Sequence, residues 1–338
     1  MDAIVLVGGQ GTRLRPLTRT RHKSLVPVCN RPAIEYLFSW LEGNGFRRAV
    51  LAIGRYNDDL ADAYRAGRPG ALEVVLVEET ERLESGGGIR NAVHQTGIDR
   101  RFVVLNGDVF VDFDFAPALR QHVEQGADLT LALHAEDDPS QYGVAVVDGN
   151  ARVTGFVEKP PPGTAPSNLV NAGVWIFERG LVDEIPAGAV RVEETLFPSL
   201  VARQRTVLGY RFPGLWADIG TPARYLDLNR ALLERDGLAV SAEGASIDPT
   251  ARVNASSLGP GARVGPRATV TNSVVWERVS IEMGASVERS ILADGVCVDA
   301  DAHIVGAVVG AGATIAAGAT VPPGTLIEPG ARYDGPND

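Results

Sequence analysis

Residues 2–18 read DAIVLVGGQGTRLRPLT, a short apolar run that ends in clustered glycines. An apolar run of this length followed by glycine predicts a buried strand over Ala3–Val7 that leads directly into a loop. Glycines after a strand let backbone N–H groups approach an anion closely, and Arg13 adds a guanidinium fork. Neither GxxxxGK[ST] nor GxGxxG is present, so an ordinary strand-to-helix turn remains an alternative for this loop.

Strand-like and helix-like segments alternate from this first strand to about residue 240. The alternation predicts a parallel, doubly wound α/β sheet with helices on both faces. Strands are expected at 3–7, 49–53, 73–77 and 102–105, and helices at 33–41, 58–66, from 90 onward, and 221–236.

The rest of the chain repeats with a period of 17 residues. Three aliphatic columns keep this spacing: Ile247, Val264, Ile281, Val298 and Ile315; Val253, Val270, Val287, Ile304 and Val321; and Leu258, Val275, Leu292, Val309 and Leu326. Steps of 6, 5 and 6 residues within one period, with Gly and Pro between columns, predict a parallel β-helix of hexapeptide type. We therefore expect two domains, 1–238 and 239–338.

Composition excludes several classes of protein. The formal charge is −10, and no tract is rich in Lys and Arg, which argues against a nucleic-acid partner. No apolar run reaches the length of a membrane span, and the N-terminus lacks the basic start of a signal peptide. The two cysteines, Cys29 and Cys297, have no metal-site spacing and fit a reducing cytoplasm.

Lysine is rare in this arginine-rich chain. It occurs only at Lys23 and Lys159, among 32 basic residues. A compact ammonium that persists where Arg is otherwise used suggests a point charge directed at a phosphate. For Lys159 the alternative is an ordinary surface ion pair with Glu158.

Two aspartates follow strand-like segments and are candidate metal ligands. Asp108 closes the run Leu105-Asn-Gly-Asp108, and Asp218 lies in Trp216-Ala-Asp-Ile-Gly. Asp108 is expected beyond the carboxyl end of a strand, where ligands bind in open parallel sheets. Two carboxylates from such distant segments could hold one Mg²⁺ whose other positions are taken by phosphate oxygens. A turn aspartate bonded to its own loop is the alternative for Asp108.

Taken in order, GGQGTRLRPLT, KSLVPV, ESGGGI, LNGD, YGV, FVEKP, NAG and WADIGTP resemble the sugar-1-phosphate nucleotidyltransferases over residues 2 to 236. With the repeats and the segment Arg191-Val-Glu-Glu194, the chain is most similar to bacterial mannose-1-phosphate guanylyltransferases that end in a left-handed β-helix. The resemblance implies a Rossmann-like catalytic sheet and transfer of a nucleotidyl group from an NTP, with GTP favoured, to a hexose-1-phosphate.

The resemblance also implies roles for individual residues. Lys23 would neutralise charge at the α-phosphate, and Lys159 would bind the sugar phosphate. The nucleotide site would comprise Gly8, Gly9, Gly11, Thr12, Arg13, Glu84, Ser85 and Gly86, the sugar site Gly143, Glu158 and Asn171, and the Mg²⁺ site Asp108 and Asp218. One departure is that His22 and Ser24 flank Lys23 where the family usually has prolines, which removes rigidity from this loop.

Several alternatives remain at this point. The same chemistry could use glucose-1-phosphate with dTTP or UTP, a heptose-1-phosphate with GTP, or N-acetylmuramate phosphate with UTP. Acyl transfer by the β-helix is disfavoured, because the helix carries one histidine (His303) and its register shows no insertion. A regulatory subunit that only binds sugar nucleotide is the remaining alternative. We expect no nucleic-acid or membrane partner, and a homo-oligomer that involves the β-helix.

Overall fold

The computed structural model describes residues 1–54, 58–236 and 240–335. These residues form two compact units, Met1–Gly9 with Ile34–Trp216 (unit 1) and Gln10–Ala33 with Ala217–Asp338 (unit 2), and we describe each unit separately. The predicted domain boundary at 238/239 lies outside the described residues. Within the described part of the chain, no helix is both long and apolar enough to cross a membrane.

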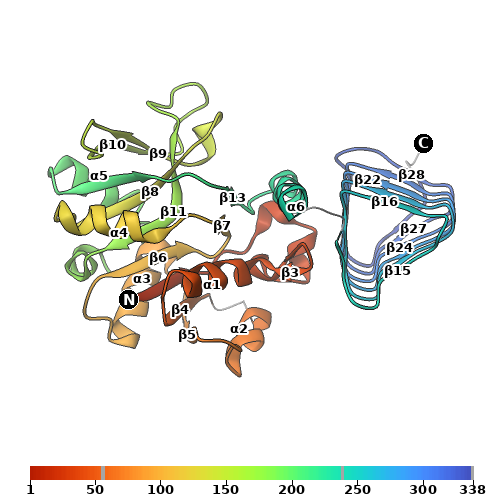
Figure 1. Ribbon diagram of the computed structural model, residues 1–338, viewed down its shortest axis with the longest axis horizontal. Coiled ribbons are helices and arrows are strands. Elements are labelled where there is room, and N and C mark those ends of the chain that lie inside the picture. The colour runs from red at the N-terminus through yellow and green to blue at the C-terminus, as the bar shows by residue number, and fades with distance from the viewer. Residues whose placement is uncertain (55–57, 237–239, 336–338) are drawn as a thin grey trace. The chain divides into compact units, whose positions relative to one another are not determined.

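Unit 1 is built on a mixed sheet of nine strands among the described residues, in the order β10-β9-β11-β6-β1-β4-β5, with β8 paired to β11 and to β12 (Figure 1). The strands are β1 (Asp2–Leu6), β4 (Arg48–Ile53), β5 (Glu73–Glu78), β6 (Phe102–Asn106), β8 (Leu129–Ala135), β9 (Gly143–Val147), β10 (Val153–Glu158), β11 (Leu169–Phe177) and β12 (Val207–Arg211). Strands β6, β1, β4 and β5 are parallel, as predicted, whereas β11 runs antiparallel to β6, β8 and β9.

Strand β1 lies between β4 and β6, and residues Ala3–Val5 are fully buried. An uninterrupted apolar run is what a parallel strand covered on both faces requires. The chain continues from β1 to β4 and β5 on one side and returns to β6 on the other, so the strand order reverses beside β1. In open α/β sheets, ligands bind at the carboxyl edge near such a reversal.

Five of the six α-helices in the described residues belong wholly or mainly to unit 1. They are α1 (Ala33–Gly43), α2 (Asp58–Arg65), α3 (Glu84–Thr96), α4 (Phe115–Glu124) and α5 (Leu196–Ala202), and unit 2 has α6 (Pro222–Asp236). Helices α3 and α5 pack on the sheet in one apolar core, through Ile89 and Val93 of α3 and Phe197 of α5. Helix α3 begins at Glu84, so Ser85 to Gly88 open this helix, as predicted, and the helical pattern expected from residue 90 continues it.

Short strands connect these elements. They are β7 (Val109–Val111) after β6, β2 (Pro27–Val28) paired with β3 (Arg31–Pro32) in unit 2, and β13 (Trp216–Asp218), where the chain passes from unit 1 into unit 2. Five 3₁₀ turns complete the described part: η1 (Thr12–Leu14), η2 (Leu17–Arg19), η3 (Lys23–Leu25), η4 (Pro139–Gln141) and η5 (Arg179–Glu184).

The C-terminal part of unit 2 is the predicted parallel β-helix, whose three sheets run through successive coils (Figure 1). Aliphatic side chains fill its interior, and alanines such as Ala262 and Ala285 occupy buried positions near the corners. Its strands are β14 (Val240–Ser241), β15 (Ser246–Ile247), β16 (Arg252–Asn254), β17 (Ser257–Leu258), β18 (Arg263–Val264), β19 (Thr269–Thr271), β20 (Val274–Val275), β21 (Ser280–Ile281), β22 (Ser286–Glu288), β23 (Ile291–Leu292), β24 (Cys297–Val298), β25 (His303–Val305), β26 (Val308–Val309), β27 (Thr314–Ile315), β28 (Thr320–Val321), β29 (Leu326–Ile327) and β30 (Arg332–Tyr333).

The predicted 17-residue register is wrong in the last coil. Val309 pairs with Ile327, and Ile315 pairs with Tyr333, both 18 residues apart. Ile327 is therefore the buried member of the third column, and Leu326, which was expected to point inward, is 59% exposed. The extra residue lies in the turn after Val321, where Pro322-Pro-Gly-Thr325 takes one more position than the turns before it.

A ladder of buried serines occupies one corner of the β-helix. The N–H groups of Ser273, Ser290 and Ala307 each donate to the hydroxyl of the serine one coil earlier, over 3.0–3.1 Å. Each hydroxyl of Ser256, Ser273 and Ser290 donates in turn to the carbonyl two residues before it. The ladder satisfies backbone groups at a turn where the strand pairing is interrupted.

Replacing the middle serine should destabilise the β-helix. In Ser273→Ala the buried N–H of Ser290 loses its acceptor, so we expect the free energy of unfolding to fall by about 1–3 kcal/mol. Denaturant unfolding measures the change. The matched control is Ser286→Ala, whose hydroxyl bonds the exposed His303 and whose loss should cost less than about 0.5 kcal/mol. Equal effects of the two substitutions would contradict the proposed role of the ladder.

Candidate active site

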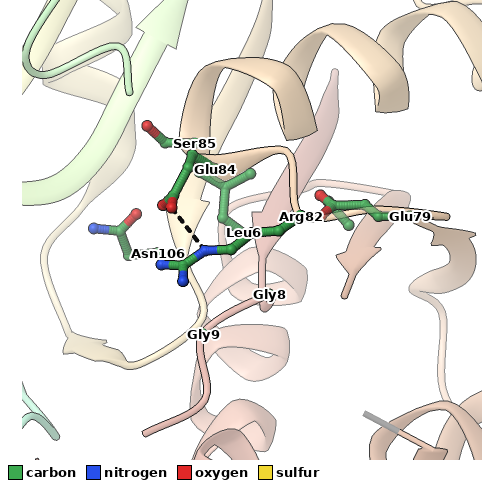
Figure 2. Close-up of a pocket in the computed structure, with 9 residues that line it drawn as sticks. Leu6, Gly8, Gly9, Glu79, Arg82, Glu84, Ser85 and Asn106 are labelled. Carbon is green, nitrogen blue, oxygen red and sulfur yellow. Dashed lines mark ion pairs between the residues drawn. The ribbon is translucent and has the colours of Figure 1, made fainter. Parts of the chain in front are cut away.

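A pocket opens in unit 1 where β1 ends. It is lined by Leu6, Gly8, Gly9, Ala52, Glu79, Arg82, Glu84, Ser85 and Asn106 (Figure 2). Four of these residues, Gly8, Gly9, Glu84 and Ser85, are predicted nucleotide ligands. The pocket thus lies at the carboxyl edge of the sheet, beside the strand-order reversal, where ligands bind in open α/β sheets.

Glycine keeps the floor of this pocket open. A Cβ on Gly9 would meet no atom within 4 Å, and one on Gly8 would approach only Glu79 Oε2 and Gly54 N, at 3.8 and 3.9 Å. A side chain at either position would therefore fit the protein but would fill space above the backbone. The absence of side chains exposes the peptide groups to a ligand.

The three glycines of α3 serve packing as well. Gly86 is buried, and its N–H donates to Val190 O over 2.7 Å, while a Cβ there would lie 2.9 Å from the same oxygen. A Cβ on Gly87 would collide with Gly188 O, and one on Gly88 would lie 2.8 Å from Glu79 Oε1. Gly86, a predicted nucleotide ligand, is thus placed against the 188–192 segment and does not line the pocket.

Glu79 also lines the pocket and was not predicted from the sequence. It is only 7% exposed, and one of its carboxylate oxygens accepts the N–H of Leu83 over 3.4 Å. Burial raises the pKa of the Glu79 carboxyl, and the nearby charge of Glu84 raises it further. Glu84 itself pairs with Arg82 over 2.7 Å, as Figure 2 shows. The signal was its position directly after β5, at the same sheet edge as Gly8.

Asn106 also lines the pocket and was quoted only as part of a motif. It is the last residue of β6, next to the end of β1. Gly173, at φ 72°, leaves room for it, because a Cβ there would lie 2.7 Å from Asn106 Nδ2. Gly107 donates its N–H to Leu6 O over 2.9 Å, which holds the following residue, Asp108, at the carboxyl edge of the sheet as predicted.

A second polar cluster in unit 1 contains the predicted sugar-phosphate residues. Glu158 ends β10, and its carboxylate lies 3.5 Å from Lys159 Nζ and 3.8 Å from an Arg191 nitrogen. Gly143 lies opposite Glu158 in the β9–β10 pair, where a Cβ would come within 2.7 Å of Glu158 Oε2. Burial raises the pKa of Glu158, the charge of Glu193 adds to the rise, and Lys159 and Arg191 oppose it.

Lys159 and Asn171 are held in defined orientations. Lys159 has φ 46°, in the left-handed region that few side chains occupy, and its N–H donates to Tyr142 O over 3.0 Å. Such strained positions are concentrated at functional sites. Asn171 Oδ1 accepts from Gly173 N over 3.1 Å and from the Trp175 indole N–H over 2.6 Å, where the register of β11 shifts against β8.

Ser85 links the pocket to this second cluster. Its hydroxyl donates to Glu193 over 2.5 Å and accepts the N–H of Val192 over 3.1 Å. Glu193 in turn is the acidic neighbour that raises the pKa of Glu158. Polar side chains therefore run from the first turn of α3, through Glu193, to the end of β10.

Unit 2 carries the remaining predicted residues, on the loop after Gly9 and at the end of β13. Gly11 has φ +60°, and a Cβ there would lie 2.9 Å from Thr18 Cγ2 and 3.1 Å from Lys23 Cβ, so glycine is required and Lys23 is packed beside it. Thr12 and Arg13, both exposed, form the turn η1 that follows. A Cβ on Gly220 would collide with Asp218 Oδ2 and lie 3.0 Å from Arg13 Nη2, so both side chains lie close to Gly220.

The residues flanking Lys23 compensate for the missing prolines. His22 Nδ1 accepts the N–H of Ser24 over 3.1 Å and caps the turn η3 that presents Lys23. A proline at position 24 would have no N–H to donate. The rigidity expected to be lost is therefore supplied by a hydrogen bond between the two substituted residues.

Two known protein families match most of this chain. The nucleotidyl transferase family matches residues 2–235, and a GlmU-like C-terminal hexapeptide family matches residues 239–325. The chain belongs to the nucleotidyl transferase family. Its reaction is nucleotidyl transfer, and its C-terminal repeats form the left-handed β-helix of the hexapeptide proteins, as predicted.

Two curated members of this family illustrate its range. Mannose-1-phosphate guanylyltransferase of Mycobacterium tuberculosis is 35% identical, with 86% of this chain and 83% of that protein covered. UTP–glucose-1-phosphate uridylyltransferase of Synechocystis is 28% identical over 88% and 89% of the two chains. Among solved structures, HddC from Yersinia pseudotuberculosis, also solved in complex with GMP-PN, matches with a TM-score of 0.59 and 25% identity. That match covers 68% of this chain and 99% of HddC.

Proposed function

We propose that this nucleotidyl transferase joins GTP and mannose-1-phosphate to give GDP-mannose and pyrophosphate. The observation that carries the choice of base is the buried carboxylate of Glu79 in the pocket at the end of β1. The M. tuberculosis relative bears the name of this activity. HddC, solved with a guanine nucleotide analogue, has the same fold.

Guanine is the base that suits a fixed carboxylate. Its Watson–Crick edge presents two adjacent N–H donors, N1–H and N2–H, which a carboxylate accepts as a bidentate pair. Adenine and cytosine place a ring acceptor beside their amino group, and uracil places a carbonyl on each side of its single N–H. Glu79 would therefore bind guanine and repel the other bases, with Glu84, Ser85 and Asn106 around it.

The cluster around Glu158 supports a hexose phosphate as the acceptor substrate. Lys159 supplies a cation for the phosphate, while Glu158 and Asn171 supply acceptors and donors for sugar hydroxyls. Only glycine fits at position 143, since a side chain there would collide with the carboxylate of Glu158. A sugar bearing a phosphate matches this combination of a cation with several hydrogen-bond acceptors and donors.

The reaction needs charge neutralisation more than acid–base chemistry. A phosphate oxygen of the sugar phosphate attacks the α-phosphorus of GTP, a new P–O bond forms, and the bond to the β-phosphate oxygen breaks to release pyrophosphate. The attacking oxygen is already anionic, so no side chain has to remove a proton. Gly8, Gly9, Gly11, Thr12 and Arg13 would bind the triphosphate, with Lys23 near the α-phosphate and Lys159 on the incoming phosphate.

Asp108 and Asp218 would hold the Mg²⁺ ion that this chemistry commonly uses. Two carboxylates leave most of the six positions of Mg²⁺ to phosphate oxygens and water, which is the usual donor set when a nucleotide is bound. Arg224 Nη1 donates to Asp218 Oδ1 over 2.8 Å, and a Cβ at Gly220 would collide with Asp218 Oδ2, so only glycine fits beside this carboxylate. A bound Mg²⁺ would neutralise the phosphate oxygens and orient the triphosphate.

We also propose a homo-oligomer that involves the β-helix, and a cytoplasmic location. Large apolar side chains exposed on the β-helix, Met283 at 42% and Leu326 at 59%, support the first proposal. A mass by light scattering that is a multiple of 35.8 kDa is the expected result, and a monomer in dilute buffer would contradict it.

One panel of assays tests the substrate assignment. Pyrophosphate release is measured for four NTPs against mannose-, glucose- and heptose-1-phosphate, with and without Mg²⁺. We expect the highest kcat/KM for GTP with mannose-1-phosphate and no turnover without Mg²⁺. A preference for UTP or dTTP would overturn the role of Glu79, and a preference for heptose-1-phosphate would overturn the sugar assignment alone.

A conservative change at Lys159 tests the phosphate assignment. In Lys159→Arg the charge is kept, but a planar guanidinium replaces the ammonium at a strained backbone position. We expect the KM for the sugar phosphate to rise about tenfold because the phosphate contact is displaced, while the KM for GTP stays unchanged. Steady-state kinetics with each substrate varied in turn measures both, and equal kcat/KM for wild type and variant would remove Lys159 from the site.

A further inference from the structure

Within unit 2, the loop Gln10–Ala33, here called the signature loop, contacts the β-helix through several polar side chains. This loop carries Arg13 and Lys23, the cations assigned to the nucleotide phosphates. Its partners lie on successive coils of the β-helix and on α6. The β-helix is therefore connected physically to the loop on which the chemistry of the proposed function depends.

Arg21 makes the most extensive of these contacts. Its guanidinium donates to Asp294 Oδ2 over 2.8 Å, lies 3.5 Å from Glu277 Oε1, and sits 5.1 Å from the centre of the Trp276 ring. Glu277 and Asp294 are 17 residues apart and so occupy equivalent positions on neighbouring coils. Two stacked carboxylates beside an aromatic face form a specific receptor for one planar cation.

Burial makes this contact energetically important. The Asp294 side chain is 17% exposed, that of Arg21 is 27% exposed, and the Trp276 residue is 1% exposed. The second oxygen of Asp294 is buried and accepts no hydrogen bond within the described residues. Removing Arg21 would thus leave a partly buried carboxylate without its cation and beside a second acid, which disfavours the docked position of the loop.

Further contacts fix the C-terminal half of the signature loop. The Trp276 indole N–H donates to the buried hydroxyl of Tyr225 on α6, over 3.0 Å, and that hydroxyl donates to Pro27 O. Asn30 Nδ2 donates to Leu258 O of the first coils over 2.8 Å, and Asn229 Oδ1 of α6 accepts the N–H of Cys29 over 2.8 Å. Lys23 lies between these contacts and Arg21, on the turn that His22 caps.

We propose that the β-helix positions the signature loop for catalysis, and that Arg21, bound to Trp276 and Asp294, is a positioning residue that sets the location of Lys23 and Arg13. The proposal rests on the proposed function for its kinetic test. It assigns the β-helix a part in the reaction without any contact to substrate. Glu277, Trp276 and Asp294 together form a binding site for a cation of the signature loop.

The test compares two arginines of the same loop. Arg21→Ala removes the buried contact, whereas the control Arg19→Ala removes an exposed pair, Arg19 with Glu328 at 3.3 Å, whose side chains are 45% and 59% exposed. Exposed pairs contribute little, so the control should behave as wild type. Asp294→Asn, which keeps the shape of the side chain, is the second variant in case Arg21→Ala folds poorly.

We expect Arg21→Ala and Asp294→Asn to lower kcat by about ten- to a hundredfold, because misplacing a catalytic group by about 1 Å can cost about a hundredfold. The KM for the sugar phosphate, whose residues are in unit 1, should not change. The double variant should lose no more than Arg21→Ala alone, because both substitutions break one contact. Wild-type kcat in both single variants, or a matching rise in the sugar-phosphate KM, would overturn the proposal.

Limited trypsin digestion gives a readout that needs no activity. Cleavage after Arg13 and Lys23 reports whether the signature loop is held, and each arginine variant removes one other trypsin site from it. At a temperature well below the Tm of each variant, we expect cleavage at both bonds to accelerate at least about fivefold in Arg21→Ala, with the Arg19→Ala pattern unchanged. An equally protected loop in Arg21→Ala would refute the proposal, and accelerated cleavage in a protein inactive on every NTP would refute only the proposed function.

Discussion

Asp108→Asn is expected to lower kcat by about a thousandfold, because it removes one of two negative charges assigned to Mg²⁺ while keeping the size of the side chain. The hydrogen bond from Gly107 to Leu6 holds the β6–β7 turn at the edge of the sheet, and the substitution does not alter it. The lost activity would therefore come from the metal site and not from a displaced turn.

The measurement is pyrophosphate release as a function of Mg²⁺ concentration. Asp108→Asn should stay slow even at high Mg²⁺, since the missing ligand also orients the triphosphate. Asp112→Asn is the matched control, because Asp112 Oδ1 accepts the N–H of Leu215 over 2.7 Å and an amide oxygen can do the same. Full activity in Asp108→Asn, or an equal loss in Asp112→Asn, would remove Asp108 from the metal site.

Glu79→Gln should lower kcat/KM for GTP about a hundredfold or more. An amide presents one acceptor and one donor, so an N–H of guanine would face an N–H of the side chain in a buried site. Uracil, whose edge combines a donor and acceptors, would match the amide better, so kcat/KM for UTP should rise. The matched control is Glu78→Gln, one residue earlier, where the exposed side chain pairs with Arg65 at 3.5 Å.

The pH profile provides an independent check on Glu79. Because burial raises the pKa of this carboxyl, it becomes protonated at a higher pH than an exposed glutamate. Only the ionised form accepts two N–H groups, so kcat/KM for GTP should fall as the pH drops through this raised pKa. Glu79→Gln should lack this acidic limb. A GTP preference and pH profile that are the same in wild type and variant would contradict the guanine assignment.

Much of the architecture could be predicted because it depends on local periodicity. The apolar run Ala3–Val5 needs cover on both faces, which only a central parallel strand provides, and the 17-residue columns predicted the β-helix coil by coil. The prediction was wrong where a turn changed length. Leu326 keeps the column spacing, but the turn Pro322–Thr325 holds one extra residue and makes Ile327 the inward side chain.

The candidate site was only partly predictable, because several of its residues matter through neighbours distant in sequence. Glu79 has no motif of its own, and its burial and raised pKa come from α3 and the end of β1 packing around it. The sequence does not distinguish Arg21 from the other arginines, of which the chain has 30 in all. Its role depends on contacts within unit 2 with Trp276 and Asp294, which lie more than 250 residues later in the chain.

The sequence alone determined the fold class, the family and the order of the phosphate-binding motifs, since these depend on residue type and spacing along the chain. Only the tertiary structure decided which carboxylate lines the pocket, why Gly86 to Gly88 must be glycine, and how His22 replaces a proline. These depend on burial and on contacts between remote segments. The physical reason is that desolvation and close packing depend on which groups surround a residue in three dimensions. The residues next to it in the sequence do not show which groups these are.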